Sequence, residues 1–139
     1  MRLQAFYVVW LAASQGRVRH DRLLCSAEHS AVFAGIPVTD YTAALPWYER
    51  FFGGPPAFLP NDTEAVWEVA AHRFVYIVRQ PGRAGNALVL SFVEDLDERV
   101  AGIAQRGIEP AGRETYGSVV KVTYRDADSN EISLGGSPG

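Results

Sequence analysis

Two stretches of the chain repeat one pattern, and they begin 55 residues apart, at positions 31 and 86. Each is a short apolar run that ends in an acid, Asp40 in the first and Asp95 in the second. Each run is followed by a segment with helical periodicity that stops at a glycine, Gly53 or Gly107. A fixed internal period of this kind indicates a duplicated supersecondary unit. The repeat therefore predicts a fold built from two similar modules.

The order of expected elements is the same in both halves. The first half predicts a strand, a helix and a strand hairpin, over residues 31–38, 41–52, 64–70 and 74–78. The second half predicts a strand, a helix, a weak strand and two further strands, over residues 87–93, 96–106, 110–116, 119–124 and 132–134. The sequence thus predicts an α+β fold. Its two βαβββ modules span about residues 31–80 and 86–135 and form a curved mixed sheet around a cavity.

Composition limits the classes of function. A chain of 139 residues predicts one domain, which we place at residues 30–136, with a short tail at 137–139. The net charge is −3 and no basic block is present, which argues against nucleic-acid binding. The lone Cys25 excludes an internal disulfide and a multi-cysteine metal site. A reduced, cytoplasmic setting is the expectation.

The first 29 residues differ from the rest. The apolar run at residues 5–13 is far shorter than the roughly 20 residues that a membrane span needs. The charged start is only Met1-Arg2, and polar Gln4 lies two residues after Arg2, which argues against a secretion signal. Residues 14–30 are polar and charged, with little periodicity. We expect residues 1–29 to be a flexible extension, and we expect no membrane partner.

Three motifs, in order, resemble the vicinal oxygen chelate superfamily, which includes glyoxalase I, bleomycin resistance proteins and extradiol dioxygenases. The first motif is Val-Thr-Asp at residues 38–40 with Leu-Pro-Trp-Tyr-Glu-Arg-Phe-Phe-Gly at 45–53. The second is Val-Glu-Asp-Leu-Asp at 93–97. The third is Tyr-Arg-Asp-Ala-Asp-Ser-Asn-Glu-Ile-Ser-Leu at 124–134. The resemblance covers about residues 31–136. It implies a homodimer in which modules pair across subunits. One fold hosts many activities, so the site residues must decide the function.

The resemblance also implies where metal ligands would lie. In the metal-dependent members they occupy the positions that are Phe33, Leu88 and Ser133 here. Phenylalanine and leucine offer no imidazole or carboxylate donor. Glu131 is two residues from Ser133, about 6–7 Å along a strand. We therefore predict no metal, no cofactor and no catalytic residue.

Two alternatives remain open. The chain could be an enzyme of the same superfamily, a metal-dependent lyase, isomerase or dioxygenase that uses Glu68, His72 or Glu131 as non-standard ligands. It could also be an interaction module whose pocket is filled. Metal content and ligand uptake distinguish these from a binding protein.

The predicted function is metal-free binding of a small organic molecule in an apolar cavity, as in the bleomycin resistance type. Alternation along strands places Phe33 with Gly35, and Leu88 with Leu90. Aromatic side chains on strands can stack on a planar ligand, and we prefer Trp67 over its neighbour Glu68 for the cavity face. The predicted ligand-binding residues are Phe33, Gly35, Trp67, Tyr76, Leu88, Leu90 and Ser133. Arg79 and Arg83 flank a Pro-Gly loop, where they could bind an anion or be solvated.

Overall fold

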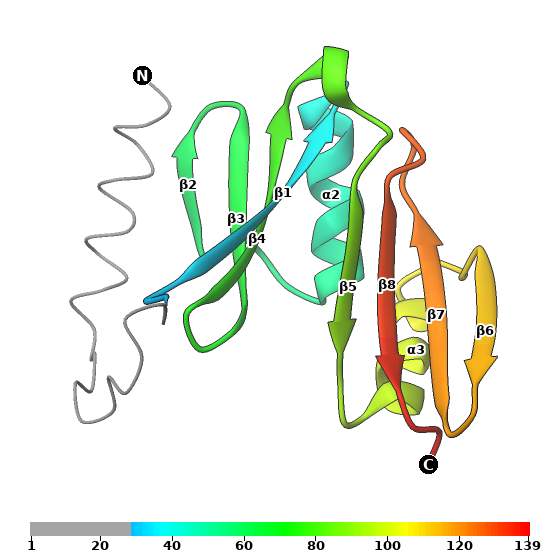
Figure 1. Ribbon diagram of the computed structural model, residues 1–139. Helices are drawn as coiled ribbons and strands as arrows, with labels where there is room; N and C mark the ends of the chain where they lie inside the picture. The colour runs from blue at the N-terminus through cyan, green and yellow to red at the C-terminus, as the bar shows by residue number, and fades with distance from the viewer. Residues whose placement is uncertain (1–28) are drawn as a thin grey trace.

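The computed structural model describes residues 29–139, which form two βαβββ modules (Figure 1). The elements of the first module are β1 (Val32–Val38), α2 (Tyr41–Phe52), β2 (Phe58–Asn61), β3 (Glu64–Ala70) and β4 (Arg73–Arg79). The elements of the second module are β5 (Leu88–Phe92), α3 (Leu96–Gln105), β6 (Gly112–Tyr116), β7 (Val119–Arg125) and β8 (Glu131–Gly136). A 3-10 turn, η1 (Pro81–Arg83), lies in the linker between them. The predicted duplicated α+β fold is confirmed. Of the expected N-terminal extension, residues 1–28 lie outside the described residues.

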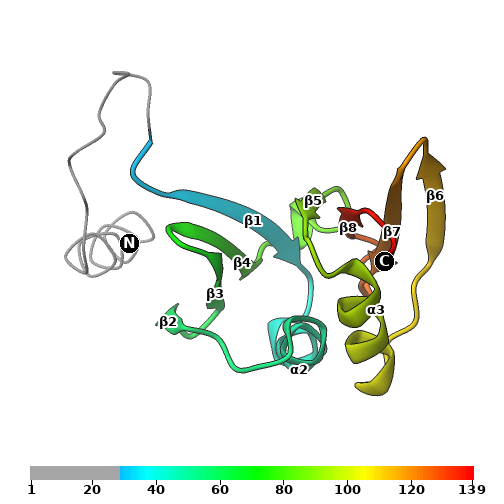
Figure 2. The same ribbon diagram turned by 90° about the horizontal axis from the view of Figure 1, so that it is seen from below.

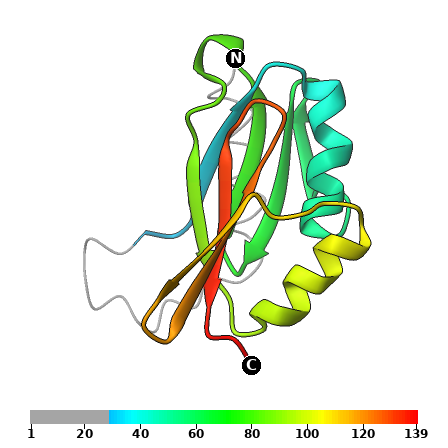
Figure 3. The same cartoon turned by 90° about the vertical axis from the view of Figure 1, so that its right-hand side faces the viewer.

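Each module contributes one four-stranded mixed sheet. The strand orders are β1-β4-β3-β2 and β5-β8-β7-β6, so the repeat extends to topology. In each sheet the first strand pairs in parallel with the last, and the other neighbours are antiparallel. Both helices lie on the same side of the sheets and contact each other (Figures 2 and 3). Among residues 29–139, each sheet therefore has one face covered by its helix and no helix on the other, and we call that other side its helix-free face.

The main core lies between the sheets and the helices. Its fully or almost fully buried side chains come from both modules, and they include Ile36, Val38, Tyr48, Phe51, Trp67, Val75, Ile77, Leu96, Ile103, Val122, Tyr124 and Ile132. In the first sheet the core residues alternate along each strand, as a period of two requires. The residues between them, such as Gly35 and Tyr76, must then lie on the helix-free face. A single core shared by both halves joins the modules into one folding unit.

Asn130 is the polar centre of the junction between the modules. Its side chain is fully buried. Its Oδ1 accepts hydrogen bonds from the backbone N–H groups of Gly85 and Ala87, each at 3.0 Å. Its Nδ2 donates to the Pro37 carbonyl at 2.7 Å and to the Asp126 carboxylate at 2.9 Å. One amide therefore connects β1, the linker and the β7–β8 turn.

Two further contacts cross the junction. The buried Tyr48 hydroxyl donates to Asp126 Oδ2 at 2.7 Å. Burial, reinforced by this carboxylate, raises the pKa of Tyr48 far above its ordinary value, so the hydroxyl stays a donor at neutral pH. In the last turn of α2, the Arg106 guanidinium donates to the carbonyls of Arg50 and Phe51. The carbonyls in the last turn of a helix have no hydrogen-bond donor within the helix, and the guanidinium supplies donors to two of them.

Candidate functional site

The helix-free face of the first module is rich in aromatic side chains. Phe33 on β1 stacks on Phe74 of β4, with ring centroids 4.5 Å apart. Phe58 of β2 lies 6.0 Å from Phe74. The parallel register of β1 and β4 places Gly35 opposite Tyr76, two residues further along. This face therefore has an aromatic end at Phe33 and Phe74 and a second aromatic position at Tyr76.

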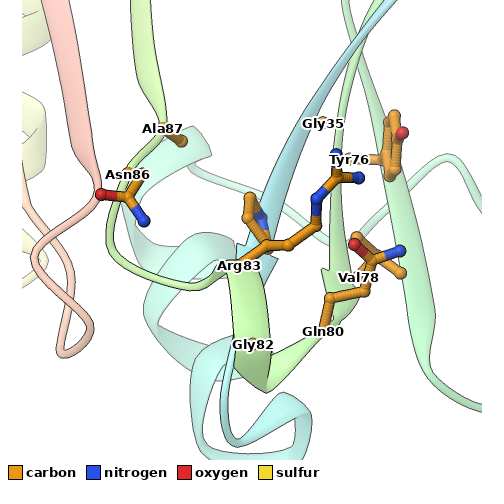
Figure 4. A pocket seen from close by; sticks show the side chains of 9 residues that line it. Gly35, Tyr76, Val78, Gln80, Gly82, Arg83, Asn86 and Ala87 are labelled. Carbon is orange, nitrogen blue, oxygen red and sulfur yellow. The ribbon is translucent and has the colours of Figure 1, made fainter.

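A pocket of about 440 Å³ lies beyond Tyr76, where β1 and β4 meet the linker (Figure 4). Its floor comes from the two strands, and its rim comes from the linker. The floor residues are Gly35, Pro37, Tyr76 and Val78. The rim residues are Gln80, Gly82, Arg83, Asn86 and Ala87. The pocket thus combines an apolar floor that contains one aromatic ring with a rim that contains three polar side chains.

Gly35 is required by the position of the Tyr76 ring. A Cβ atom at residue 35 would lie 2.6 Å from both the Cζ and the hydroxyl oxygen of Tyr76. No real Cβ contact is that short, so any side chain here would displace the ring. A glycine in a strand often marks the close approach of another group. Here that group is the protein's own Tyr76, which lies across β1 at the floor of the pocket.

The linker that forms the rim is held in place by backbone hydrogen bonds. Gln80 N–H donates to the Val38 carbonyl and Arg83 N–H donates to the Gln80 carbonyl, each at 3.0 Å. Gly85 has a φ of 95°, and a Cβ there would lie 2.7 Å from the Asp128 carbonyl oxygen. Glycine alone fits both conditions at this position. The rim is therefore a fixed wall of the pocket.

The helix-free face of the second module carries exposed apolar side chains. Leu88, Leu90 and Phe92 alternate along β5 and are 79%, 48% and 68% exposed. The register of β5 with β8 places Leu90 beside Ser133. Ser133 is buried, and its hydroxyl is 3.0 Å from that of Thr123. Leu88, Leu90 and Ser133 thus share one face, but none of them lines the pocket of the first module.

A larger hollow of about 1120 Å³ lies between the modules, near the turn between β3 and β4 and the start of α3. Its wall contains charges of both signs, including Arg73, Arg99, Glu94 and Asp95. Arg99 is already paired with Asp95 at 2.7 Å. Its wall also carries apolar side chains of both modules, among them Phe52, Val75 and the predicted ligand-binding residue Leu90, so charged and apolar groups are mixed in it.

The sequence-based placement of Trp67 is wrong. Trp67 lies in the core under α2, 5.0 Å from the Phe52 ring, and its indole N–H donates to the Gly54 carbonyl at 3.0 Å. The next residue, Glu68, lies opposite Phe74 in the sheet and is exposed. The alternation of β3 therefore has the opposite phase to the one predicted. The reason is that the largest apolar ring finds more contact area beneath a helix than on a half-open sheet face.

The residues proposed as non-standard metal ligands do not converge. His72 lies in the tight turn between β3 and β4, with a φ of 59°. Glu131 belongs to the other module and pairs with Arg125 at 2.8 Å. Within residues 29–139, no three His, Cys, Asp or Glu side chains are grouped as metal ligands would be. No helix in this part of the chain combines the length and the apolar character that crossing a bilayer requires.

The rim of the pocket was largely missed by sequence reasoning. Gln80 lies in a loop that has no apolar periodicity, and Asn86 and Ala87 were assigned only to the start of the second repeat, so no pattern marked them as pocket residues. Arg83 was noted with Arg79 as an arginine that could bind an anion or be solvated, and it was not among the predicted ligand-binding residues. The available signal was the repeat itself, because it identifies residues 80–87 as the connection between two sheets, where a cleft is common.

Comparison with solved structures places this geometry in a family. A glyoxalase/bleomycin resistance protein from Catenulispora acidiphila DSM 44928 is 46% identical, with a TM-score of 0.76, and the match covers 79% of this chain and 100% of that one. The chain therefore belongs to the glyoxalase/bleomycin resistance protein family, within the vicinal oxygen chelate superfamily. No protein-family model matches the chain, and no curated protein does.

More distant structures share the fold. TnmS3, an antibiotic binding protein from Streptomyces sp. CB03234, is 21% identical, with a TM-score of 0.65, over 82% of this chain and 100% of that one. A bleomycin-binding protein in complex with bleomycin is 16% identical, with a TM-score of 0.63, over 79% of this chain and 100% of that one. At these identities the likeness concerns the fold alone.

Proposed function

We propose that this chain binds a small organic molecule in the pocket between Tyr76 and the linker, and that it performs no chemistry on that molecule. The observation that carries the proposal is the pocket itself. Its volume of about 440 Å³ falls within the roughly 300–1,000 Å³ of typical ligand sites. Its apolar floor and its few polar rim groups are the usual composition of such sites.

The relatives support the same class of function. One of the structures that share the fold is a bleomycin-binding protein and another is an antibiotic binding protein. A role in sequestering an organic molecule needs no catalytic group, and the pocket lining offers none of the paired acid and base groups that catalysis uses.

The proposed binding is metal-free. Phe33 and Leu88 occupy the two strand positions where the superfamily resemblance would place ligands, and neither side chain can donate to a divalent cation. The third position is Ser133, whose hydroxyl is already engaged with Thr123. These residue types support a site built on shape and polarity.

One experiment tests binding and metal content together. Elemental analysis of purified protein is expected to find less than stoichiometric zinc, nickel, iron or manganese. Titration with the neutral fluorescent probe phenylnaphthylamine is expected to show saturable binding. Tyr76→Ala should weaken that binding about 2–10-fold, because a stacking face contributes roughly 0.5–1.5 kcal/mol beyond burial.

Leu59→Ala, at an exposed leucine of β2 away from the pocket, serves as the control and should leave binding unchanged. A metal bound at about one per chain and lost with Glu68→Gln or His72→Ala would replace the binding proposal with the enzyme alternative. If the parent chain and Tyr76→Ala bind phenylnaphthylamine with equal affinity, the probe does not bind in this pocket and the proposed site is wrong.

We also propose that the protein is a homodimer. Leu88, Leu90 and Phe92 of the edge strand β5 form an exposed apolar surface strip on the helix-free face of the second module. A second copy is the partner that the superfamily resemblance implies, with modules paired across subunits. Its helix-free face would cover this surface and close the pocket of the first module, which is open at its side.

Sedimentation at micromolar concentration checks this assembly and should give twice the mass of one chain. Leu88→Glu should shift the protein to a monomer, because it places a charge in the apolar interface. Leu59→Glu adds the same charge at a leucine that is 58% exposed outside this surface, and it should remain a dimer. A parent chain that sediments as a monomer at this concentration would contradict the proposal.

A further inference from the structure

The charges around the pocket are of one sign. Within residues 29–139, Arg83 is the only lining residue whose side chain is charged at neutral pH, and the other polar lining groups are the amides of Gln80 and Asn86 and the hydroxyl of Tyr76. Glu64 shares this face of the sheet, opposite Val78 in β3, but it is fully buried and does not line the pocket. The pocket therefore carries a positive charge and amide donors above an apolar floor.

Arg83 is available to a ligand. Among residues 29–139, its guanidinium makes no hydrogen bond or ion pair, whereas Arg99, Arg106 and Arg125 are each engaged. Figure 4 shows its side chain extending from η1 toward the Tyr76 side of the pocket. Its charged head thus lies within the site, although its backbone belongs to the linker.

The position of Arg83 is also fixed before any ligand arrives. The backbone of η1 is tied to the end of β1 through Gln80 and Val38. Two and four residues after Arg83, the backbone N–H groups of Gly85 and Ala87 donate to the buried Asn130. Binding then costs the ordering of one side chain and not of a loop, which favours affinity.

We propose that Arg83 is the anchor for an anionic group, and that the pocket takes a planar organic anion such as an aromatic carboxylate or sulfonate. This inference rests on the function proposed above. The guanidinium forms paired, charge-assisted hydrogen bonds with such groups, and the Gln80 and Asn86 amides add donors beside it. The planar body of the ligand lies over Tyr76 and Pro37. A cationic ligand would meet Arg83 with no lining carboxylate to offset the repulsion.

Two fluorescent probes test this inference because they differ by one charged group. Anilinonaphthalene sulfonate and phenylnaphthylamine share the same aromatic rings, and only the first is an anion. The parent chain is expected to bind the sulfonate more tightly, and added salt should weaken only that binding. Arg83→Gln should lower the affinity for the sulfonate about tenfold and change that for the neutral probe less than about twofold, as expected when a charge-assisted hydrogen bond is lost.

Two further variants define the outcome. Arg83→Lys should keep part of the preference for the sulfonate, since it keeps the charge and loses the planar fork. Arg113→Gln removes an exposed arginine of β6 outside the pocket and should change neither affinity. If both probes bind through Tyr76 and Arg83→Gln affects neither, the anchor is wrong and the proposed function stands. If neither probe binds, or Tyr76→Ala affects neither, the proposed function fails and the inference fails with it.

Discussion

Replacing Asn130 with alanine is expected to lower the free energy of unfolding by about 3 kcal/mol, because a buried polar group left without a partner costs about 1–3 kcal/mol. The substitution removes the acceptor for two backbone N–H groups, Gly85 and Ala87, and the donor to the Pro37 carbonyl. All three belong to the junction between the modules. A thermal melt should show a midpoint lower by about 10 °C or more for a domain of this size.

Asn86→Ala is the matched control, since Asn86 is exposed and lies one residue from Ala87. Surface substitutions of that kind usually change stability by less than about 0.5 kcal/mol. Tyr48→Phe should fall between the two, because it removes only the hydrogen bond to Asp126. An Asn130→Ala protein that melts with the parent chain would show that the junction does not depend on this amide.

Trp67→Ala is expected to destabilise the fold by about 3–5 kcal/mol, the usual cost of deleting a large aromatic side chain from a core. The ring packs against Phe52 and Tyr48 under α2. Its N–H also satisfies the Gly54 carbonyl just after the end of α2. Urea unfolding should report this loss at an unchanged m-value, provided that the variant still folds.

The comparison with Tyr76→Ala separates a core aromatic from a pocket aromatic. Tyr76 is only half-buried and lines the pocket, so its loss should affect probe binding far more than stability. Trp67→Phe should retain most of the stability, because it keeps an aromatic ring in the core. A Trp67→Ala protein of parental stability that no longer binds the probe would reverse the two assignments.

The fold was accessible from the sequence because its signals are local. The caps at Asp40 and Gly53 delimit α2, and both are used as expected: the Asp40 carboxylate accepts from Ala43 N–H, and Gly53 adopts the left-handed conformation. The apolar alternation of β1 and β5 is equally local. Because both halves have the same order of elements, the elements predicted for one half could be checked against those predicted for the other.

Local sequence signals did not predict which face of the sheet each strand residue occupies. Residues 64–70 carry apolar side chains at both phases of the alternation, so Trp67 and Val66 are equivalent in pattern. Only the docking of α2 decides between them, and that is a tertiary contact. Gly35 illustrates a different limit, because its pairing with Tyr76 depends on the register between strands more than 40 residues apart. The position of Arg83 at the rim of the pocket depends both on tertiary contacts and on the register between strands.

The pocket is built from residues of both repeats. Its floor belongs to the first repeat, but Asn86 and Ala87 of its rim are the first residues of the second repeat, and the N–H of Ala87 is held by the Asn130 amide of that repeat. The first module alone would have the floor without this part of the rim. The complete site therefore needs both repeats joined in one chain. Substitutions in the linker would then change the specificity of the site without disturbing the core of either module.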